Sequence, residues 1–429
     1  MRKSYKYRIN PSKRKVKNLT QKLGICGWFY NSLRQLRINV WEKEQRTINY
    51  YEQQDLLPNL KDQYPLLKKV HSQIIQDVVD RTNKAWKPFY QKQNKVAKLK
   101  QKILELVDKK KLEKLKKILD KTKIINYPRE KKSNRYHSFT YPQNNSFELA
   151  KSQLKLERKN SLWINVVKHR ELEGTPKTCS ISLKNSKWYT IFSCEVENKP
   201  KLDSQSIPLN KQVGVDVNTS ENNFYVLDNG YKCPNPQWFQ TKEKLLGKEQ
   251  RKLDRKQHKR NKEDKSKPSK NYHQGQFQFA KKAEKVSNRR LDFIFKEVKK
   301  LTDNYDFFGV ENFKSSKIVE KSKEKNKWYS AKRMYDSSLS SLLKKLSYGV
   351  EATGKIERVI SPAYTSQTCS KCEKKAPIKQ ELKDRIFICV FCGLVLDRDV
   401  NSARNILREA QKKEFGADFL TKDYSLVPV

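Results

Sequence analysis

The start of the chain changes from an alternating pattern to a helical one. Ser4 to Pro11 reads SYKYRINP, in which apolar and polar or basic side chains alternate up to a proline, as in a short strand. From about Lys13 apolar residues recur every three or four positions, the spacing at which side chains share one helix face. Two such stripes flank Pro58 and Pro65: Leu19, Leu23, Cys26, Tyr30, Leu33 and Arg37, then Ile74, Val78, Ala85 and Phe89. The pattern predicts a strand followed by a helical bundle.

The middle of the chain returns to a period of two. Lysine-faced helices are first expected around Leu99, Ile103, Leu106 and Val107, and around Leu112, Leu115, Ile118 and Leu119. Beyond them, LWINVVKH, KTCSISLK and KWYTIFSCEVE alternate like strands and are broken at Gly174, Pro176 and Asn185. They predict a β-rich module, and a small barrel is one fold that such a module can take. The polar stretch ENKPKLDSQSIPLN then marks a boundary.

A second architecture begins at Val213. GVDVN followed by FYVLDNGYK predicts a strand and a hairpin, with turn chemistry at Asp228, Asn229 and Gly230. Lys242 to Lys300 is very basic and predicts two long helices, with breaks near Pro268 and Gly275. DFFGVENF reads as a buried strand that ends in a carboxylate, and a helix is expected from about Asp336 to Gly349.

The charge of the chain points to a polyanionic partner. Lys and Arg number 94 against 47 acidic residues, a net charge of +47. Nucleic acid suits such a chain, because neutralising many phosphates releases condensed counterions. No apolar run of about 18 residues and no signal-peptide segment is present in the sequence, so we expect a cytoplasmic protein of a bacterium or archaeon with no membrane partner.

Four of the eight cysteines form two close pairs. Cys369, Cys372, Cys389 and Cys392 have the spacing C-x2-C-x16-C-x2-C, which predicts a tetrahedral zinc site on two knuckles. A site of four thiolates has no open position, so the zinc would be structural. An iron-sulfur cluster or a redox pair is the alternative. The other four cysteines are scattered, as expected in a reducing compartment.

Carboxylates stand at three comparable places. Asp397 and Asp399 precede a helical stripe at Ala403, Ile406, Leu407 and Ala410. Asp397 is interpreted as the helix cap, whereas Asp399 is assigned to chemistry because Asp216 interrupts an apolar strand and Glu311 ends another. Three acids converging beside a sheet could hold two Mg²⁺ ions and hydrolyse phosphodiesters. Acids at strand ends are common, however, so spacing alone leaves this open.

Two longer motifs carry a family resemblance. SPAYTSQTCSKCE and CGLVLDRDVNSARNIL resemble the C-terminal signature of TnpB, the transposon-encoded RNA-guided nucleases, and of their relatives the miniature type V CRISPR effectors. Looser similarity runs through YKYRINPSK, RYHSFTYPQ, GVDVN, KVSNRRLDF and GVENF. The resemblance implies a RuvC-type, RNase H-like nuclease whose catalytic, Mg²⁺-binding acids fall on Asp216, Glu311 and Asp399.

The resemblance also implies an α+β multidomain architecture. Residues 1–12 and 128–205 would form a wedge β-barrel, with a helical recognition domain at 13–127. Residues 206–365 and 395–429 would form the RuvC-like nuclease domain, with a target-binding zinc ribbon at 366–394 inserted in it. The expected partners are a guide RNA and a target double-stranded DNA, which pair as a heteroduplex.

Five residues are candidates for nucleic-acid contact: Tyr5, Tyr7, Arg8, Arg289 and Arg290. An aromatic strand is more often core, which is the alternative for the two tyrosines. Two positions depart from the family pattern, namely Glu373, where glycine is usual after the first knuckle, and Phe295, where histidine often follows. They leave the geometry of the ribbon turn and of one helix uncertain.

Three function classes remain open. An RNA-guided DNA endonuclease leads, and within that class TnpB and a miniature CRISPR effector are not separable from these residues, nor are a monomer and a dimer on the RNA. A strand-transferring transposase or integrase can use the same fold and acids. A nuclease-inactive nucleic-acid-binding regulator is the third class, which the presence of all three acids disfavours.

Overall fold

The computed structural model describes most of the chain in two compact units. The described residues are 1–105, 113, 115, 116, 118, 119, 126–132, 135–158, 161–218, 222–236, 238–258, 269–313, 338–377 and 384–416. The units are Met1–Glu197 and Asn198–Val429. The predicted helical positions Leu106, Val107 and Leu112, the break at Pro268 and the helix start at Asp336 lie outside the described residues.

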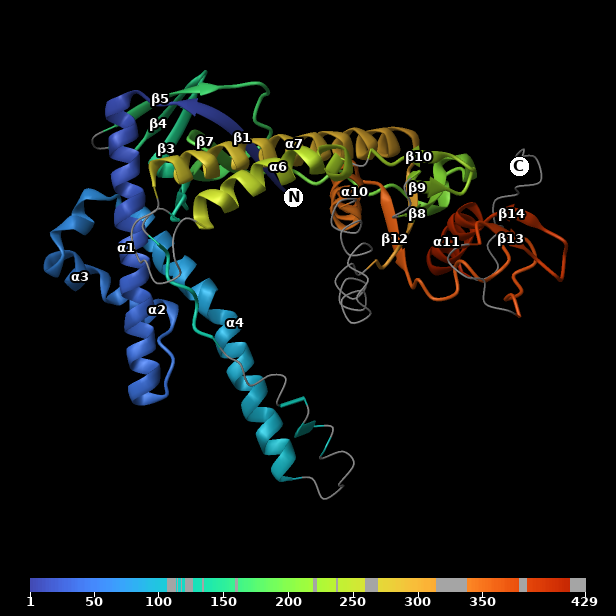
Figure 1. Cartoon of the computed structure of the whole chain (residues 1–429), viewed down its shortest axis with the longest axis horizontal. Coiled ribbons are helices and arrows are strands. Elements are labelled where there is room, and N and C mark those ends of the chain that lie inside the picture. Colours follow the sequence, from blue (N-terminus) through green and yellow to red (C-terminus); the bar gives the residue numbers. More distant parts are fainter. Residues whose placement is uncertain are drawn as a thin grey trace. The chain divides into compact units, whose positions relative to one another are not determined.

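The first unit contains a sheet (Figure 1). It has seven strands in the order β2-β6-β7-β1-β5-β4-β3. Its strands are β1 (Arg2–Asn10), β2 (Ser138–Tyr141), β3 (Phe147–Ala150), β4 (Gln153–Leu156), β5 (Leu162–Val167), β6 (Thr175–Lys184) and β7 (Lys187–Glu195). The N-terminal strand β1 is central and pairs antiparallel with both β5 and β7. The predicted strands are therefore confirmed, and the first residues of the chain complete a sheet built mostly after residue 137. The break predicted at Pro176 is wrong, because Pro176 lies inside β6, next to a register shift against β7.

Alternation along β1 corrects one expectation. Tyr5, Tyr7 and Ile9 point to one side, and the tyrosines are only 4% and 0% exposed. Their rings pack in the core of the first unit, so the predicted contact with nucleic acid does not hold for them. Arg8, on the other face, is exposed.

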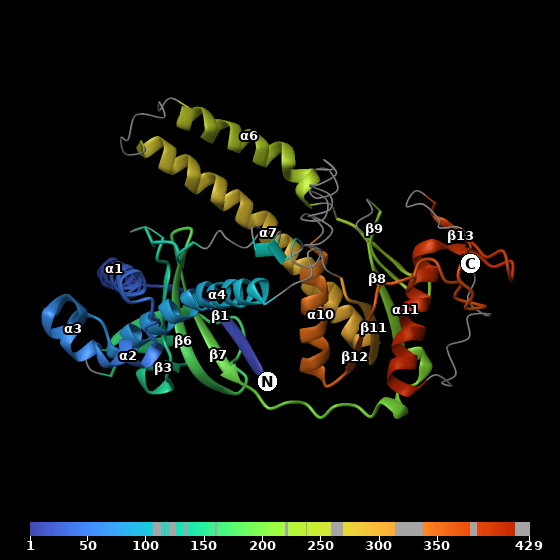
Figure 2. The same cartoon turned by 90° about the horizontal axis from the view of Figure 1, so that it is seen from below.

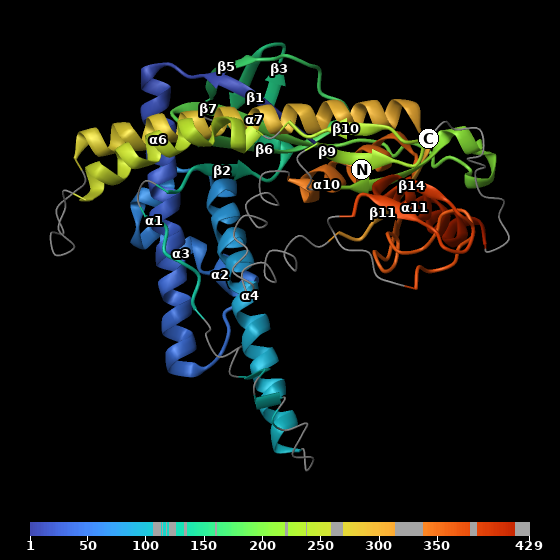
Figure 3. The same cartoon turned by 45° about the vertical axis from the view of Figure 1, so that its right-hand side comes forward.

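Within the described residues of this unit, four α-helices accompany the sheet. They are α1 (Lys13–Glu44), α2 (Tyr50–Asp55), α3 (Leu57–Gln63) and α4 (Ser72–Leu104), of which α4 packs against α1 and α2 (Figure 3). The predicted stripes are confirmed, because their apolar members on α1 and most of those on α4 lie in the core. Arg37 is also buried, and its Nε and Nη2 both donate to the side-chain oxygen of Gln53 at 3.0 and 2.6 Å.

The second unit contains a five-stranded sheet in the order β10-β9-β8-β11-β12. Its strands are β8 (Gln212–Val217), β9 (Asn223–Leu227), β10 (Lys232–Pro234), β11 (Phe307–Glu311) and β12 (Ile356–Ile360). The strands β8, β9 and β10 are antiparallel neighbours, whereas β8, β11 and β12 run parallel. The predicted hairpin and the DFFGVE strand are both present.

Helices cover the two faces of this sheet (Figure 2). Val213, Val215, Phe308 and Val310 pack against α7 (Lys270–Asn304) and α10 (Leu339–Thr353). On the opposite face Phe307 packs against Ile406 and Leu407 of α11 (Arg398–Phe415). The sheet is therefore a layer between helices, and both faces of its central strands are buried.

The basic region forms a pair of helices that pack against each other, α6 (Trp238–His258) and α7. The break predicted at Gly275 is wrong, because Gly275 lies inside α7. A side chain at that position would approach the Leu253 methyl group to 3.2 Å, so the glycine allows close packing of the two helices instead of ending one of them. None of the helices in the described ranges has the long apolar stretch that crossing a membrane requires.

Candidate active site and metal centre

Asp216 and Glu311 lie on adjacent strands. The parallel pairing of β8 with β11 sets Val215 beside Val310, so the next residues along the two strands are the two acids. Each acid follows a glycine by two residues, namely Gly214 and Gly309. Because side chains alternate, both carboxylates lie on the sheet face that α11 covers, near the carboxyl ends of the parallel strands.

The two glycines allow α11 to lie very close to the sheet. A Cβ atom at Gly214 would stand 2.1 Å from the carbonyl oxygen of Ala403, and one at Gly309 would stand 2.9 Å from the carbonyl oxygen of Ile406. Only a residue without a side chain allows such an approach. This contact brings the first turn of α11, and Asp399 with it, to the sheet edge that carries Asp216.

The first turn of α11 separates the roles of its two aspartates. Asp397 is the cap, because its Oδ1 accepts hydrogen bonds from the backbone N–H groups of Asp399 at 2.9 Å and Val400 at 3.2 Å. Its Oδ2 accepts from Lys232 Nζ at 2.5 Å. This leaves the Asp399 carboxylate for other partners, and its Oδ2 accepts from Asn218 Nδ2 at 2.6 Å. The cap predicted for Asp397 is confirmed.

Burial raises the pKa of all three acids, and the other two carboxylates act on Asp216 as well. Burial raises the pKa of Asp216 well above its usual value, and the carboxylates of Glu311 and Asp399 raise that pKa further. Burial also raises the pKa of Glu311, which a hydrogen bond from Thr365 partly offsets, and the pKa of Asp399, which Arg385 partly offsets. The cluster therefore favours added positive charge.

Sequence reasoning missed the polar residues that hold these acids. Asn218 bonds to Asp399, the Thr365 hydroxyl donates to Glu311 Oε1 at 2.6 Å, and Arg385 Nη1 lies 3.6 Å from Asp399 Oδ2. Asn218 ends the GVDVN motif and Thr365 begins TSQT, so both stood inside motifs that were already singled out. Their partners, however, are 181 and 54 residues away along the chain.

The four paired cysteines come together as predicted. Over the described part of the chain they are the one group of three or more candidate ligands whose ligand atoms all lie within 4.8 Å of one another. The three carboxylates do not form so tight a group. The Sγ atoms of Cys369 and Cys392, and those of Cys372 and Cys389, are 3.5 Å apart. Sulfurs on a tetrahedral zinc ion stand about 3.8 Å apart for Zn–S bonds of about 2.3 Å, so the four cysteines fit a zinc ribbon.

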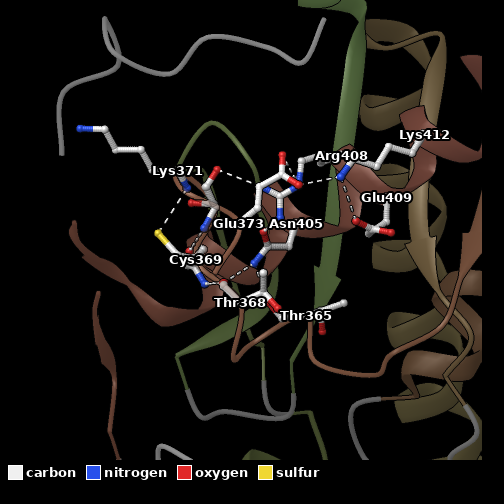
Figure 4. A network of polar contacts seen from close by, with 11 residues as sticks. Thr365, Thr368, Cys369, Lys371, Glu373, Asn405, Arg408, Glu409 and Lys412 are labelled. Carbon is white, nitrogen blue, oxygen red and sulfur yellow. Dashed lines mark hydrogen bonds and ion pairs between the residues drawn. The ribbon is translucent and has the colours of Figure 1, made fainter. Parts of the chain in front are cut away.

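The two knuckles share one backbone design. Glu373 N–H donates to the carbonyl oxygen of Cys369 at 3.0 Å, and Gly393 N–H donates to that of Cys389 at 2.9 Å. Both residues are in the left-handed region, with φ of 61° and 70°. Glu373 thus keeps the turn that glycine usually makes, and its carboxylate pairs with Lys412 at 2.7 Å and with Arg408 at 3.7 Å (Figure 4). The turn at Glu373, where the family usually has glycine, is therefore intact.

Two strands and one helix position this ribbon. β13 (Ile386–Ile388) pairs with β14 (Val395–Asp397), and β14 leads directly into α11. The metal centre and Asp399 are consequently parts of one continuous segment. Of the basic candidates on α7, Arg289 is exposed and Arg290 is half-buried.

Two family models match this chain. Residues 340–406, which include the four cysteines and Asp399, match the model for the Cas12f1-like TNB domain. Residues 192–322, which include Asp216 and Glu311, match the model described as "Probable transposase". The two matches cover the sheet, the ribbon and the start of α11.

Full-length relatives extend this similarity. A protein of Streptomyces pristinaespiralis, described as a candidate RNA-guided DNA endonuclease, is 24% identical over 416 residues, which are 95% of this chain and 89% of that protein. InsQ of Escherichia coli, described in the same words, is 25% identical over 290 residues, or 66% of this chain and 68% of that protein. The chain is thus similar to proteins described as RNA-guided DNA endonucleases and to a family model of transposases.

A solved structure is also similar to this chain over most of its length. It is a mini-RNA-guided CRISPR endonuclease that is 10% identical, with a TM-score of 0.48, and the similarity covers 98% of this chain and 94% of that one. The structure shows the mixed α/β fold. The zinc-ribbon-like domain lies within the residues that match the TNB family model.

Proposed function

We propose that this protein is an RNA-guided DNA endonuclease whose catalytic acids are Asp216, Glu311 and Asp399. The observation that carries the proposal is their arrangement: β8, β11 and α11 carry three acids from distant parts of the chain, and the carboxylates of Glu311 and Asp399 lie close enough to Asp216 to raise its pKa. A chain with a net charge of +47 supplies the setting for a nucleic-acid substrate. Guide RNA and target double-stranded DNA are the partners.

The acids fit divalent cations by their chemistry. Carboxylate oxygens are the ligands that Mg²⁺ prefers, and a cluster whose repulsion raises the pKa of Asp216 gains from bound positive charge. When bound there, two Mg²⁺ ions supply an activated water and stabilise the leaving oxygen of a phosphodiester. Asn218 and Thr365 orient two of the acids, while the four cysteines hold a structural zinc ion apart from the reaction.

The domain plan follows the same proposal. Three antiparallel strands joined to two further parallel strands, with α11 packed on one face, support a RuvC-like, RNase H-like domain at 206–365 and 395–429. The zinc ribbon occupies 366–394. The seven-stranded sheet supports a wedge barrel from 1–12 and 128–205, with the recognition helices at 13–127 between its two parts. Arg8, Arg289 and Arg290 are proposed nucleic-acid contacts.

A cleavage assay tests the proposal. The protein, purified with RNA transcribed from its own locus, is mixed with Mg²⁺ and a duplex that matches the guide. We expect guide-dependent cuts, and a loss of roughly 100-fold or more in Asp216→Asn, which keeps the side-chain shape and removes the charge. Asp303→Asn is the matched control, because Asp303 is an exposed acid paired with Lys299. Joined strands instead of cut ends would favour a transposase, and guide-independent or absent cutting would end the proposal.

A further inference from the structure

Thr365 links the zinc ribbon to the proposed catalytic Glu311. Its hydroxyl donates to Glu311 Oε1 at 2.6 Å, and the residue is only 7% exposed. Among the residues that the structure describes, Thr365 is the one donor to the Glu311 carboxylate. A hydrogen bond to a buried carboxylate is strong and directional, so Thr365 determines how the Glu311 side chain lies.

Asn405 of α11 holds Thr365 in place. Its Nδ2 donates to the carbonyl oxygens of Thr365 at 2.8 Å and Thr368 at 2.7 Å, and the residue is 1% exposed (Figure 4). Arg408 Nη2 donates to the Asn405 side-chain oxygen at 2.6 Å. Because a guanidinium can only donate, Asn405 must turn its oxygen toward Arg408 and its NH₂ group toward the two carbonyls.

Two residues of α11 also form hydrogen bonds with the start of the first knuckle. Asn401 Nδ2 donates to the Thr368 carbonyl oxygen at 2.8 Å, while its Oδ1 accepts from the Ser370 N–H at 2.9 Å. Arg408 Nη1 donates to the Ser370 carbonyl oxygen at 3.1 Å. Cys369, one of the four clustered thiols, lies between these bonds. Residues 365–370 are therefore fixed at one end by the metal centre and along their length by α11.

We propose that Thr365 is a positioning residue, which orients the Glu311 carboxylate for divalent-cation binding while Asn405 and the zinc knuckle hold Thr365 in register. This inference rests on the proposed function, since it assigns Glu311 to cation binding. A glutamate side chain has three rotatable bonds, and ordering it costs free energy that a fixed partner supplies in advance. Thr365 acts through Glu311 and need not touch the substrate.

Three variants separate this role from simple packing. Thr365→Val replaces the hydroxyl by a methyl group of similar size, whereas Thr365→Ser keeps the hydroxyl. Thr368→Val is the matched control, because it makes the same change three residues away, at a residue that forms its hydrogen bonds through backbone atoms. Mn²⁺ affinity is measured by electron paramagnetic resonance on the full-length protein with its RNA, and cleavage is measured as a function of Mg²⁺ concentration.

We expect Thr365→Val to weaken Mn²⁺ binding roughly 10-fold and to raise the Mg²⁺ concentration for half-maximal cleavage by a similar factor, as is typical when the partner of a metal ligand is removed. Thr365→Ser should stay within about twofold of the native protein, and Thr368→Val should match it. Zinc content should not change. If Thr365→Val does not fold, Thr365→Ala, which adds no carbon to the buried site, replaces it.

Several results would overturn the inference. Native Mn²⁺ affinity in Thr365→Val, an equal loss in Thr365→Ser, or an equal loss in Thr368→Val would each show that the hydroxyl does not position Glu311. The two proposals fail separately. If the native protein never cuts DNA but Thr365→Val still weakens Mn²⁺ binding, the positioning role stands and the endonuclease proposal falls. Guided cutting with no effect of Thr365→Val gives the opposite result.

Discussion

Replacing Gly214 by alanine should push α11 away from the sheet. The new Cβ atom would stand 2.1 Å from the carbonyl oxygen of Ala403 and 2.9 Å from the Cβ atom of Leu407, whereas ordinary contacts begin near 3.4 Å. The atom that it meets first is helix backbone, which cannot rotate away as a flexible side chain can. The helix must therefore move by roughly 1 Å to restore normal contact distances.

The displacement has two costs. Overpacking a well-filled core typically lowers the free energy of unfolding by about 1–3 kcal/mol, and a backbone clash belongs at the upper end of that range. Since α11 carries Asp399 at its first turn, the same movement also separates Asp399 from Asp216. A misplacement of about 1 Å among reacting groups can lower a rate by roughly 100-fold. Cleavage should therefore fall by much more than the loss of folded protein explains.

A graded series of glycine variants measures both effects. Gly309→Ala should be milder, because its closest new contacts are 2.9 Å. Gly247→Ala in α6 is the control: no atom lies within 4 Å of its Cβ position, and the change gains up to about 1 kcal/mol in helix propensity. Urea unfolding and guided cleavage are compared across the series. A Gly214→Ala protein with native stability and native cleavage would refute the close packing of α11 on β8.

Three further predictions concern other parts of the molecule. Burial raises the pKa of Asp77 from 3.8 to about 6, so the charged carboxylate destabilises the fold. The stability that the protonated carboxyl contributes is therefore complete below pH 3.8 and is lost as the pH rises through about 6. Asp77→Asn should remove up to about 3 kcal/mol of that pH dependence, and unchanged slopes in denaturation from pH 3.5 to pH 7 would contradict it. The free energy of unfolding of Glu373→Ala should be about 1 kcal/mol lower than that of Glu373→Gly, because alanine keeps the left-handed strain. Both variants lose the same exposed ion pairs, so equal melting temperatures would count against strain at φ 61°. Cys372→Ser should lose bound zinc, measured by native mass spectrometry, and with it guided cleavage; full zinc occupancy would disprove the four-thiol centre.

Local signals in the sequence predicted the elements and the metal centre well. The knuckle spacing, the two helical stripes and the alternating strands each depend on residues close together in the chain, so their periods could be read directly. Asp397 could be interpreted as a cap for the same reason, because capping involves atoms only two or three residues apart. Gly275 was misread, since a helix tolerates glycine where a neighbouring helix packs closely.

Which face of a strand packs against the core was harder to predict. Alternation shows that Tyr5 and Tyr7 share a face with Ile9, but only the packing of the first unit shows that this face is the core. The partners of Asp399 and Glu311 were equally hidden. Asn218 and Thr365 are ordinary polar residues until the fold brings them to the acids.

By itself, the sequence determined the basic character of the chain, the order of its helices and strands, and the cysteine pairs that fit zinc, because each follows from composition or from short-range spacing. The tertiary structure decided which acids share an edge, which tyrosines are covered, and that Thr365 joins the ribbon to Glu311. The physical reason is that strand register and the close approach of α11 at Gly214 are set by packing between segments far apart in the chain, and no local pattern records that packing.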